Sequence, residues 1–164
     1  MAGLINELLT VLNEQTENYE NLLALSHEKH QVLVENDVKA LQKITNVENI
    51  IVGNNQRLEK KRVKITADIS TVLGKRESDM TLSLLAEMIK QQEEYPALVD
   101  VSKRLRTAVE DLKEVNDRNK TLLEFSLDYI DFTMNLVRSS ASDAPPSNYN
   151  NSVQPDSTLF QAKQ

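Results

Sequence analysis

Two histidines three residues apart, His27 and His30, are the first residues whose types and spacing could support chemistry. On a helix this spacing could hold a metal ion, but the chain has no third histidine and no cysteine to complete a site. A surface histidine on a helical bundle can also accept a phosphoryl group, and Lys29 is adjacent, yet the small residues usual beside such a histidine are missing. We therefore expect no metal and no cofactor, and histidine phosphotransfer stays as a lesser alternative.

No other group of residues indicates catalysis or nucleic-acid binding. The chain has no Gly-rich phosphate loop and no Ser, His and Asp spacing of a hydrolase, so we expect no enzyme. The basic segment 57–64 has no interleaved aromatic residue on which bases could stack. A formal charge of −6 and a pI near 5.0 also argue against nucleic acid as a partner.

Composition points to long helices as the elements that position any site. The 164 residues include only 3 Gly, 4 Pro and 4% aromatic residues, and no convincing strand pattern occurs. No run of about 18 apolar residues is present, so we expect no membrane insertion. The N-terminus lacks the basic start of a signal peptide and carries Glu7, which predicts a soluble cytoplasmic protein.

Apolar residues recur at three- and four-residue steps along four segments, which predict helices at residues 3–35, 38–73, 81–94 and 96–138. Asp37 is the expected N-cap of the second helix, Gly74 its expected end, and Asp79 or Thr81 the cap of the third. The first helix is acidic and the second basic, which favours an antiparallel hairpin. The expected fold is an all-α antiparallel bundle, with a helical domain at 1–138 and a disordered tail at 139–164.

The last helix carries more apolar surface than a bundle helix needs. On a helical wheel its apolar residues fill an arc of about 220°, whereas a core-facing stripe needs somewhat over about 100°. These apolar residues are Leu122, Leu123, Phe125, Leu127, Tyr129, Ile130, Phe132, Met134, Leu136 and Val137. The helix should pack on its own core and still present an apolar face to a partner.

Two asparagines, Asn116 and Asn119, interrupt the apolar stripe of this helix. A buried asparagine can fix the alignment of packed helices at a cost in stability. Alternatively, the two amides face a partner and offer it donors and acceptors. The spacing leaves both interpretations open.

The residues around these asparagines resemble a known family. The run LKEVNDRNKTLL at 112–123 is similar to the L-x-x-L/V-N-x-x-N-x-x-L-L signature in the last helix of FlgN-type flagellar export chaperones. The following EFSLDYIDF resembles the S-L-x-Y-I-x-F continuation of Gram-positive members. The order of helices also matches over residues 1–138, while the specific motif covers only about 112–132.

The resemblance implies a cytosolic chaperone that binds the hook–filament junction proteins FlgK and FlgL. It would hold amphipathic terminal segments of these proteins in a groove, prevent premature assembly and deliver them to the flagellar export apparatus. The residues expected to bind substrate are Leu112, Asn116, Asn119, Leu122, Leu123, Ser126, Tyr129, Ile130 and Thr133. Tyr149 in the tail is the candidate for export-gate docking, although Asn150 and Asn151 follow it where the family has glycines.

A different class of function also fits the last helix. Its apolar stripe could serve a structural coiled-coil adaptor that self-associates as a homodimer. The short turn at 36–37 would also permit an oligomer in which copies exchange helices. The Leu159-Phe160 pair in the tail could fold back into the groove beside the last helix, which would act as autoinhibition.

Overall fold

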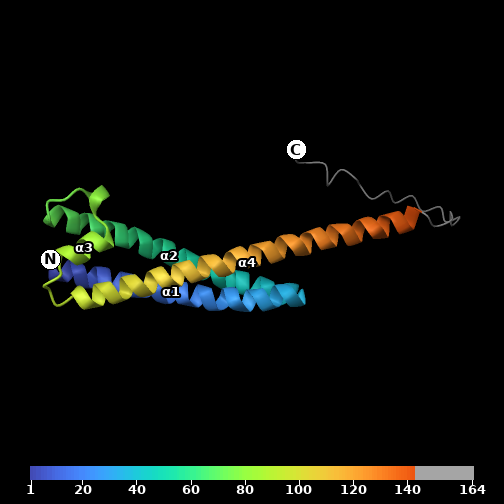
Figure 1. The fold of residues 1–164 in the computed structure, drawn as a ribbon, viewed down its shortest axis with the longest axis horizontal. Helices are drawn as coiled ribbons and strands as arrows, with labels where there is room; N and C mark the ends of the chain where they lie inside the picture. The colour runs from blue at the N-terminus through green and yellow to red at the C-terminus, as the bar shows by residue number, and fades with distance from the viewer. Residues whose placement is uncertain (143–164) are drawn as a thin grey trace. The chain divides into compact units, whose positions relative to one another are not determined.

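The structure is a computed structural model that describes residues 1–142. In chain order its elements are α1 (Ala2–Glu35), α2 (Val38–Val72), η1 (Glu77–Asp79), α3 (Leu82–Met88) and α4 (Tyr95–Ser142). This confirms the predicted all-α fold of a helical hairpin, a short helix and a long last helix (Figure 1). Over the described range there is no helix long and apolar enough to cross a membrane.

The turn between α1 and α2 takes two residues, as predicted. Asn36 adopts the left-handed conformation with φ 56°, which asparagine tolerates better than most residues. This conformation lets the N–H of Asp37 donate to the carbonyl of Val32 at 3.1 Å, so the end of α1 is satisfied. The carboxylate of Asp37 then accepts from the N–H of Ala40 at 3.0 Å and begins α2.

The end of α2 is also formed by local signals. Gly74 has φ 64°, a conformation with little cost only for glycine. The N–H of Lys75 donates to the carbonyl of Ser70 at 2.9 Å, which closes the helix. The predicted role of Gly74 is therefore confirmed.

The third helix is shorter than predicted. Thr81, one of the two predicted caps, accepts from the N–H of Leu84 at 3.1 Å, but α3 ends at Met88 rather than at residue 94. Residues 89–94 form turns, in which the N–H of Gln92 donates to the carbonyl of Ile89 at 2.7 Å. Because Pro96 has no N–H and belongs in a first helical turn, the chain must break before it and start α4 anew.

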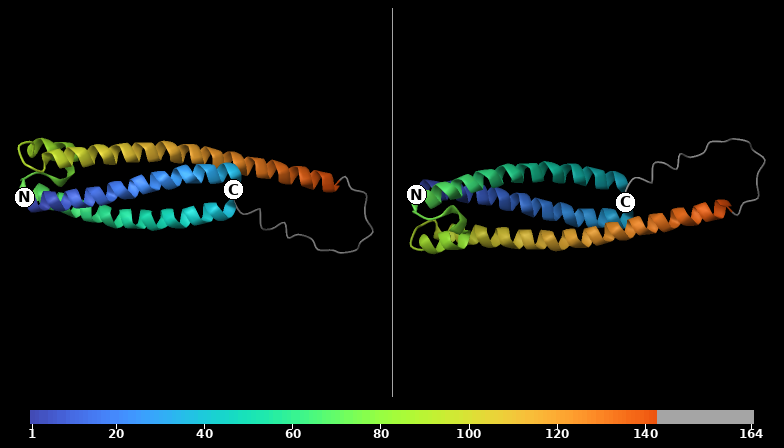
Figure 2. Two further views of the ribbon diagram at one scale, coloured as in Figure 1. Left: turned by 90° about the horizontal axis from the view of Figure 1, so that it is seen from below. Right: turned by 90° about the horizontal axis from the view of Figure 1, so that it is seen from above.

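Residues 1–126 and the residues from 127 onward form two separate units. Within the first unit, α2 runs antiparallel to α1, and α4 runs in the same direction as α1 (Figures 1 and 2). The α1–α4 direction is also evident from two contacts, Glu20 with Arg104 and Ser26 with Asn116. The helix α4 continues to Ser142, four residues beyond the predicted end at 138.

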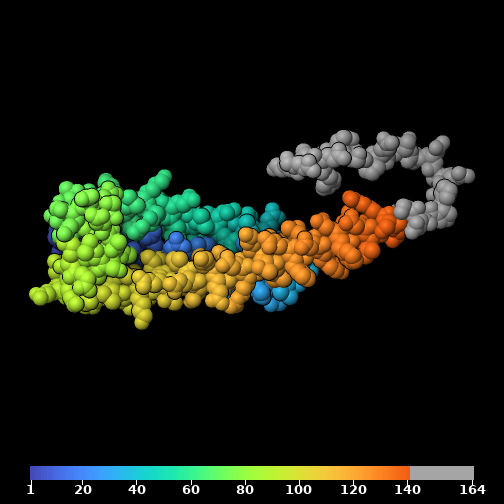
Figure 3. All heavy atoms as spheres, turned by 45° about the horizontal axis from the view of Figure 1, so that its top comes forward, coloured from blue at the N-terminus to red at the C-terminus, as the bar shows by residue number. Residues whose placement is uncertain are grey.

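The hydrophobic core of the first unit lies at the end where η1 and α3 cover the long helices (Figure 3). All four α-helices contribute fully buried side chains there. They are Ile5, Leu8, Val11 and Leu12 of α1, Leu58 and Ile69 of α2, Leu85 of α3 with Ile89 just after it, and Leu98 and Val101 of α4. The helix α3 thus fills the place of a fourth helix at one end of the bundle.

Two parts of the predicted apolar seams are not buried. The three- and four-residue steps of α2 predict that Val72 follows Ile69 on the core face, but Val72 is exposed and Leu73 packs against the core cluster instead. The same steps predict that the seam of the last helix continues through Tyr129, Thr133 and Leu136, but in the second unit these residues are exposed. The buried part of that seam ends with the half-buried Ser126.

The predicted charge pairing of the hairpin is only partly observed. Lys61 of α2 lies 3.5 Å from Glu7 of α1, which is the predicted direction. Lys29 of α1 lies 2.7 Å from Glu48 of α2, which is the reverse. The apolar core therefore accounts for the hairpin better than the opposite net charges of its helices.

Candidate functional site

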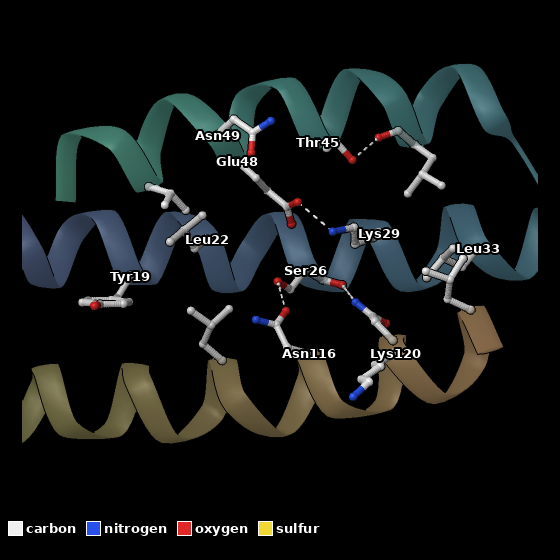
Figure 4. Close-up of a pocket in the computed structure, with 15 residues that line it drawn as sticks. Tyr19, Leu22, Ser26, Lys29, Leu33, Thr45, Glu48, Asn49, Asn116 and Lys120 are labelled. Carbon is white, nitrogen blue, oxygen red and sulfur yellow. Dashed lines mark hydrogen bonds and ion pairs between the residues drawn. The ribbon is translucent and has the colours of Figure 1, made fainter. Parts of the chain in front are cut away.

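An open groove of about 580 Å³ lies between α1, α2 and α4 within the first unit (Figure 4). The helix α1 contributes one face at three- and four-residue steps, and α2 and α4 each contribute one wall. The lining residues are Tyr19, Leu22, Ser26, Lys29, Leu33, Leu41, Thr45, Glu48, Asn49, Val52, Leu112, Asn116, Asn119, Lys120 and Leu123.

The groove continues the place that α3 occupies at the other end. Leu8 and Leu12 lie in the core beside α3. On the same stripe of α1, Tyr19 follows Leu12 by one heptad and Leu22 follows Leu8 by two heptads, and both line the groove. The seven residues of α3 span roughly 10 Å, whereas the 34 residues of α1 span roughly 50 Å. The fourth-helix position is therefore filled at one end of the unit and open beside the groove.

A polar layer separates the core from the groove. Gln15 donates to Glu59 at 3.1 Å, and Asn18 donates to Asn55 at 2.9 Å, so both contacts join α1 to α2. Arg62 also donates to Glu59 at 2.8 Å, and this hydrogen bond holds the pKa of Glu59 below its ordinary value. The core cluster includes no α1 residue beyond Leu12, so it ends before the groove begins at Tyr19.

The two asparagines of α4 have different environments. The side chain of Asn119 is 4% exposed; its amide nitrogen donates to the carbonyl of Ser26 at 2.8 Å, and its oxygen lies 3.1 Å from Nδ1 of His30. Asn116 is exposed, and its oxygen accepts from the hydroxyl of Ser26 at 2.9 Å. Asn119 therefore joins α4 to α1, whereas the amide nitrogen of Asn116 is available at the groove.

The other half of the groove contains an ion pair. Lys29 and Glu48 meet at 2.7 Å with side-chain exposures of 24% and 15% (Figure 4). Each residue follows a groove-lining leucine by seven positions, Leu22 on α1 and Leu41 on α2. In the sequence, Lys29 and Glu48 therefore stand as charged residues in apolar stripes. This signal could have located this part of the groove.

The structure brings together four of the nine predicted binding residues, since Leu112, Asn116, Asn119 and Leu123 line the groove. Leu122 and Ser126 are half-buried on α4 outside it, and the hydroxyl of Ser126 donates to the carbonyl of Leu122. Tyr149 lies outside the described residues, as do the Leu159-Phe160 pair and most of the predicted tail.

The remaining three predicted binding residues belong to the second unit. Tyr129, Ile130 and Thr133 are exposed on α4 there. The groove residues of α1 and α2 were not predicted. They lie on the same apolar stripes as the core residues of these helices, and the periodicity alone does not show where the core ends and the groove begins.

Residues 1–142 contain no group of three or more His, Cys, Asp or Glu side chains placed to hold a metal ion. The helical spacing predicts His30 at the edge of the core, but His27 and His30 are both exposed. The hydrogen bond between His30 and Asn119 turns one ring nitrogen toward α4.

Comparison with known proteins identifies the family. No curated protein and no solved structure matches the chain. A family model described as FlgN protein matches residues 1–157, which is nearly the whole chain and includes the motif around Asn116 and Asn119. The chain therefore belongs to the FlgN family of flagellar export chaperones.

Proposed function

We propose that this chain binds amphipathic terminal segments of the junction proteins FlgK and FlgL in the cytosol, prevents their premature assembly and delivers them to the flagellar export apparatus. The observation that carries the proposal is the groove between α1, α2 and α4, which continues the fourth-helix position of the bundle. A bundle with one helix position open can accept a helix from another protein.

The dimensions of the groove support a helical ligand. Its α1 face extends over the fifteen residues from Tyr19 to Leu33, or about 21 Å, which matches roughly four turns of helix. Apolar anchors at i, i+3, i+4 and i+7 of a ligand helix would meet Leu22, Leu112 and Leu123.

The expected affinity is moderate. Three or four buried anchors contribute about 1.5–3 kcal/mol each, and the loss of translational and rotational freedom offsets a large part of that sum. Binding in the micromolar range follows, which suits a chaperone that must release its cargo.

The groove also has polar groups that can orient a ligand. The amide nitrogen of Asn116 lies on one wall, and the ammonium group of Lys120 makes no ion pair within the part of the chain described. These donors suit an acceptor-bearing ligand face. A cargo segment held here has its apolar stripe covered and cannot pair with other subunits.

Titration calorimetry with peptides from the termini of FlgK and FlgL tests the proposal. We expect binding to the wild-type chain and loss of binding in Leu123→Glu, because a carboxylate would then lie at the apolar rim of the groove. Val99→Glu is the matched control, since Val99 is also 42% exposed on α4 but lies outside the groove. The absence of binding to the wild-type chain at about 50 µM peptide would refute the proposal.

The proposal also includes cargo contacts by Tyr129, Ile130 and Thr133 of the second unit and export-gate docking by Tyr149. Ile130→Glu should weaken cargo binding, and an unchanged affinity would show that the second unit makes no cargo contact. Tyr149→Ala should leave peptide affinity unchanged and reduce delivery to the export apparatus, measured as secretion of FlgK from cells.

A further inference from the structure

The second unit carries an apolar surface that the groove does not explain. Seven large apolar side chains between residues 127 and 137 are 49% to 67% exposed on α4. They form two rows at three- and four-residue steps. The aromatic seam is Tyr129, Phe132 and Leu136, and the aliphatic seam is Leu127, Ile130, Met134 and Val137.

The two seams lie on different sides of the helix. At 100° per residue, their centres are about 145° apart around the helix axis. Thr133 lies between them on one side. Its hydroxyl donates to the carbonyl of Tyr129, so this donor needs no hydrogen bond from a partner. The other gap holds Asp128, Asp131 and Asn135.

One partner helix cannot cover both seams. A helix packed against another covers a single a/d stripe, so a second seam 145° away would remain in water. Half exposure of seven large side chains leaves roughly 700 Å² of apolar surface, more than monomers usually show and close to one partner's share of a stable interface.

The charge of the segment favours a basic partner over a second copy. Residues 127–137 contain two acids, Asp128 and Asp131, and no base. Two copies packed in parallel would place these acids beside each other, and like charges along a helix interface are unfavourable. A foreign helix with Lys or Arg beside its apolar stripe would pair with them.

We propose that residues 127–137 bind two α-helices of one partner at the same time, one on each seam, with basic residues facing Asp128 and Asp131. The inference rests on the proposed function, because it takes the junction proteins as the partner. It adds a docking surface beyond the groove and a requirement for a helical pair.

Photocrosslinking with the full chain and full-length FlgK tests this inference. Benzoylphenylalanine replaces Phe132 of the aromatic seam, Met134 of the aliphatic seam or, as the control, Val99, which is exposed on α4 outside the groove and outside residues 127–137. We expect positions 132 and 134 to label two different helices of FlgK and position 99 to label none.

Affinity measurements on substituted chains complete the test. Phe132→Asp and Met134→Asp should each weaken FlgK binding at least tenfold, and the helicity should not change because both side chains are exposed. Labelling of one and the same FlgK helix from both seams overturns the inference. Labelling of a second copy of this chain overturns it as well, in favour of self-association.

The two proposals fail in distinguishable ways. If the wild-type chain binds FlgK and both seam variants bind it equally well, only the two-helix inference is refuted. If the wild-type chain binds neither FlgK nor FlgL, the proposed function and the inference are both refuted.

Discussion

Replacement of Asn119 by alanine should destabilise the chain, whereas the same change at Asn116 should not. Asn119 is buried and links α4 to α1 through the carbonyl of Ser26 and the ring of His30. Asn116 is exposed and makes one hydrogen bond, from the hydroxyl of Ser26. The pair thus separates the structural role of an asparagine in the seam from a role at the surface.

The magnitude follows from the contacts that are lost. Two hydrogen bonds of about 1 kcal/mol each are removed in Asn119→Ala, and a small cavity adds to the loss. The higher helix propensity of alanine stabilises the variant by about 0.6 kcal/mol, so the net destabilisation is about 1–2 kcal/mol. In Asn116→Ala one part-buried hydrogen bond of about 1 kcal/mol is lost and about 0.6 kcal/mol of helix propensity is gained, which leaves a change within about 0.5 kcal/mol.

Urea unfolding followed by circular dichroism measures both values, provided that the slope m is unchanged. A loss of about 1.5 kcal/mol corresponds to a fall in Tm of about 3–6 °C for a chain of this length. Equal stability of Asn119→Ala and the wild-type chain would refute the structural role of Asn119. A larger loss in Asn116→Ala than in Asn119→Ala would show that the two environments are assigned the wrong way round.

Three further predictions concern the first unit. Leu85→Ala should cost about 2–5 kcal/mol in urea unfolding, because Leu85 is the buried anchor of α3, and a loss below about 1 kcal/mol would contradict the fourth-helix role of α3. Gly74→Ala should cost about 1 kcal/mol by the same assay, since φ is 64° there; no change would mean that another cap forms. Arg62 lowers the pKa of Glu59 below 4.5, so this contact stabilises the fold above pH 4.5 and is lost as the pH falls through the lowered pKa. Glu59→Gln should therefore lose less stability than the wild-type chain between about pH 6 and about pH 3, and an equal loss in both chains would refute the role of the pair.

Helix boundaries could be predicted because their signals are local. Asp37, Gly74 and Thr81 each bond with residues at most five positions away, so their effect is visible in a short stretch of sequence. The length of α3 could not be predicted. Its end depends on the turn that must precede Pro96 and on the burial of Ile89 in the core cluster.

The family was also evident in the sequence, since the motif at 112–123 is contiguous and the family match confirms it. The candidate site was only half evident. Leu112, Asn116, Asn119 and Leu123 were expected, but the groove walls on α1 and α2 were not, because Lys29 and Glu48 meet only when two helices are packed together.

The sequence by itself determined which residues share a face of each helix, because 3.6 residues per turn relates spacing directly to direction. Which neighbour each face meets was decided only by the tertiary structure. Asn119 and Ser26 are 93 positions apart, and no local pattern distinguishes an asparagine bonded to a distant carbonyl from one exposed at a groove. The same packing left the fourth-helix position open beyond α3, and a cargo segment is proposed to bind there.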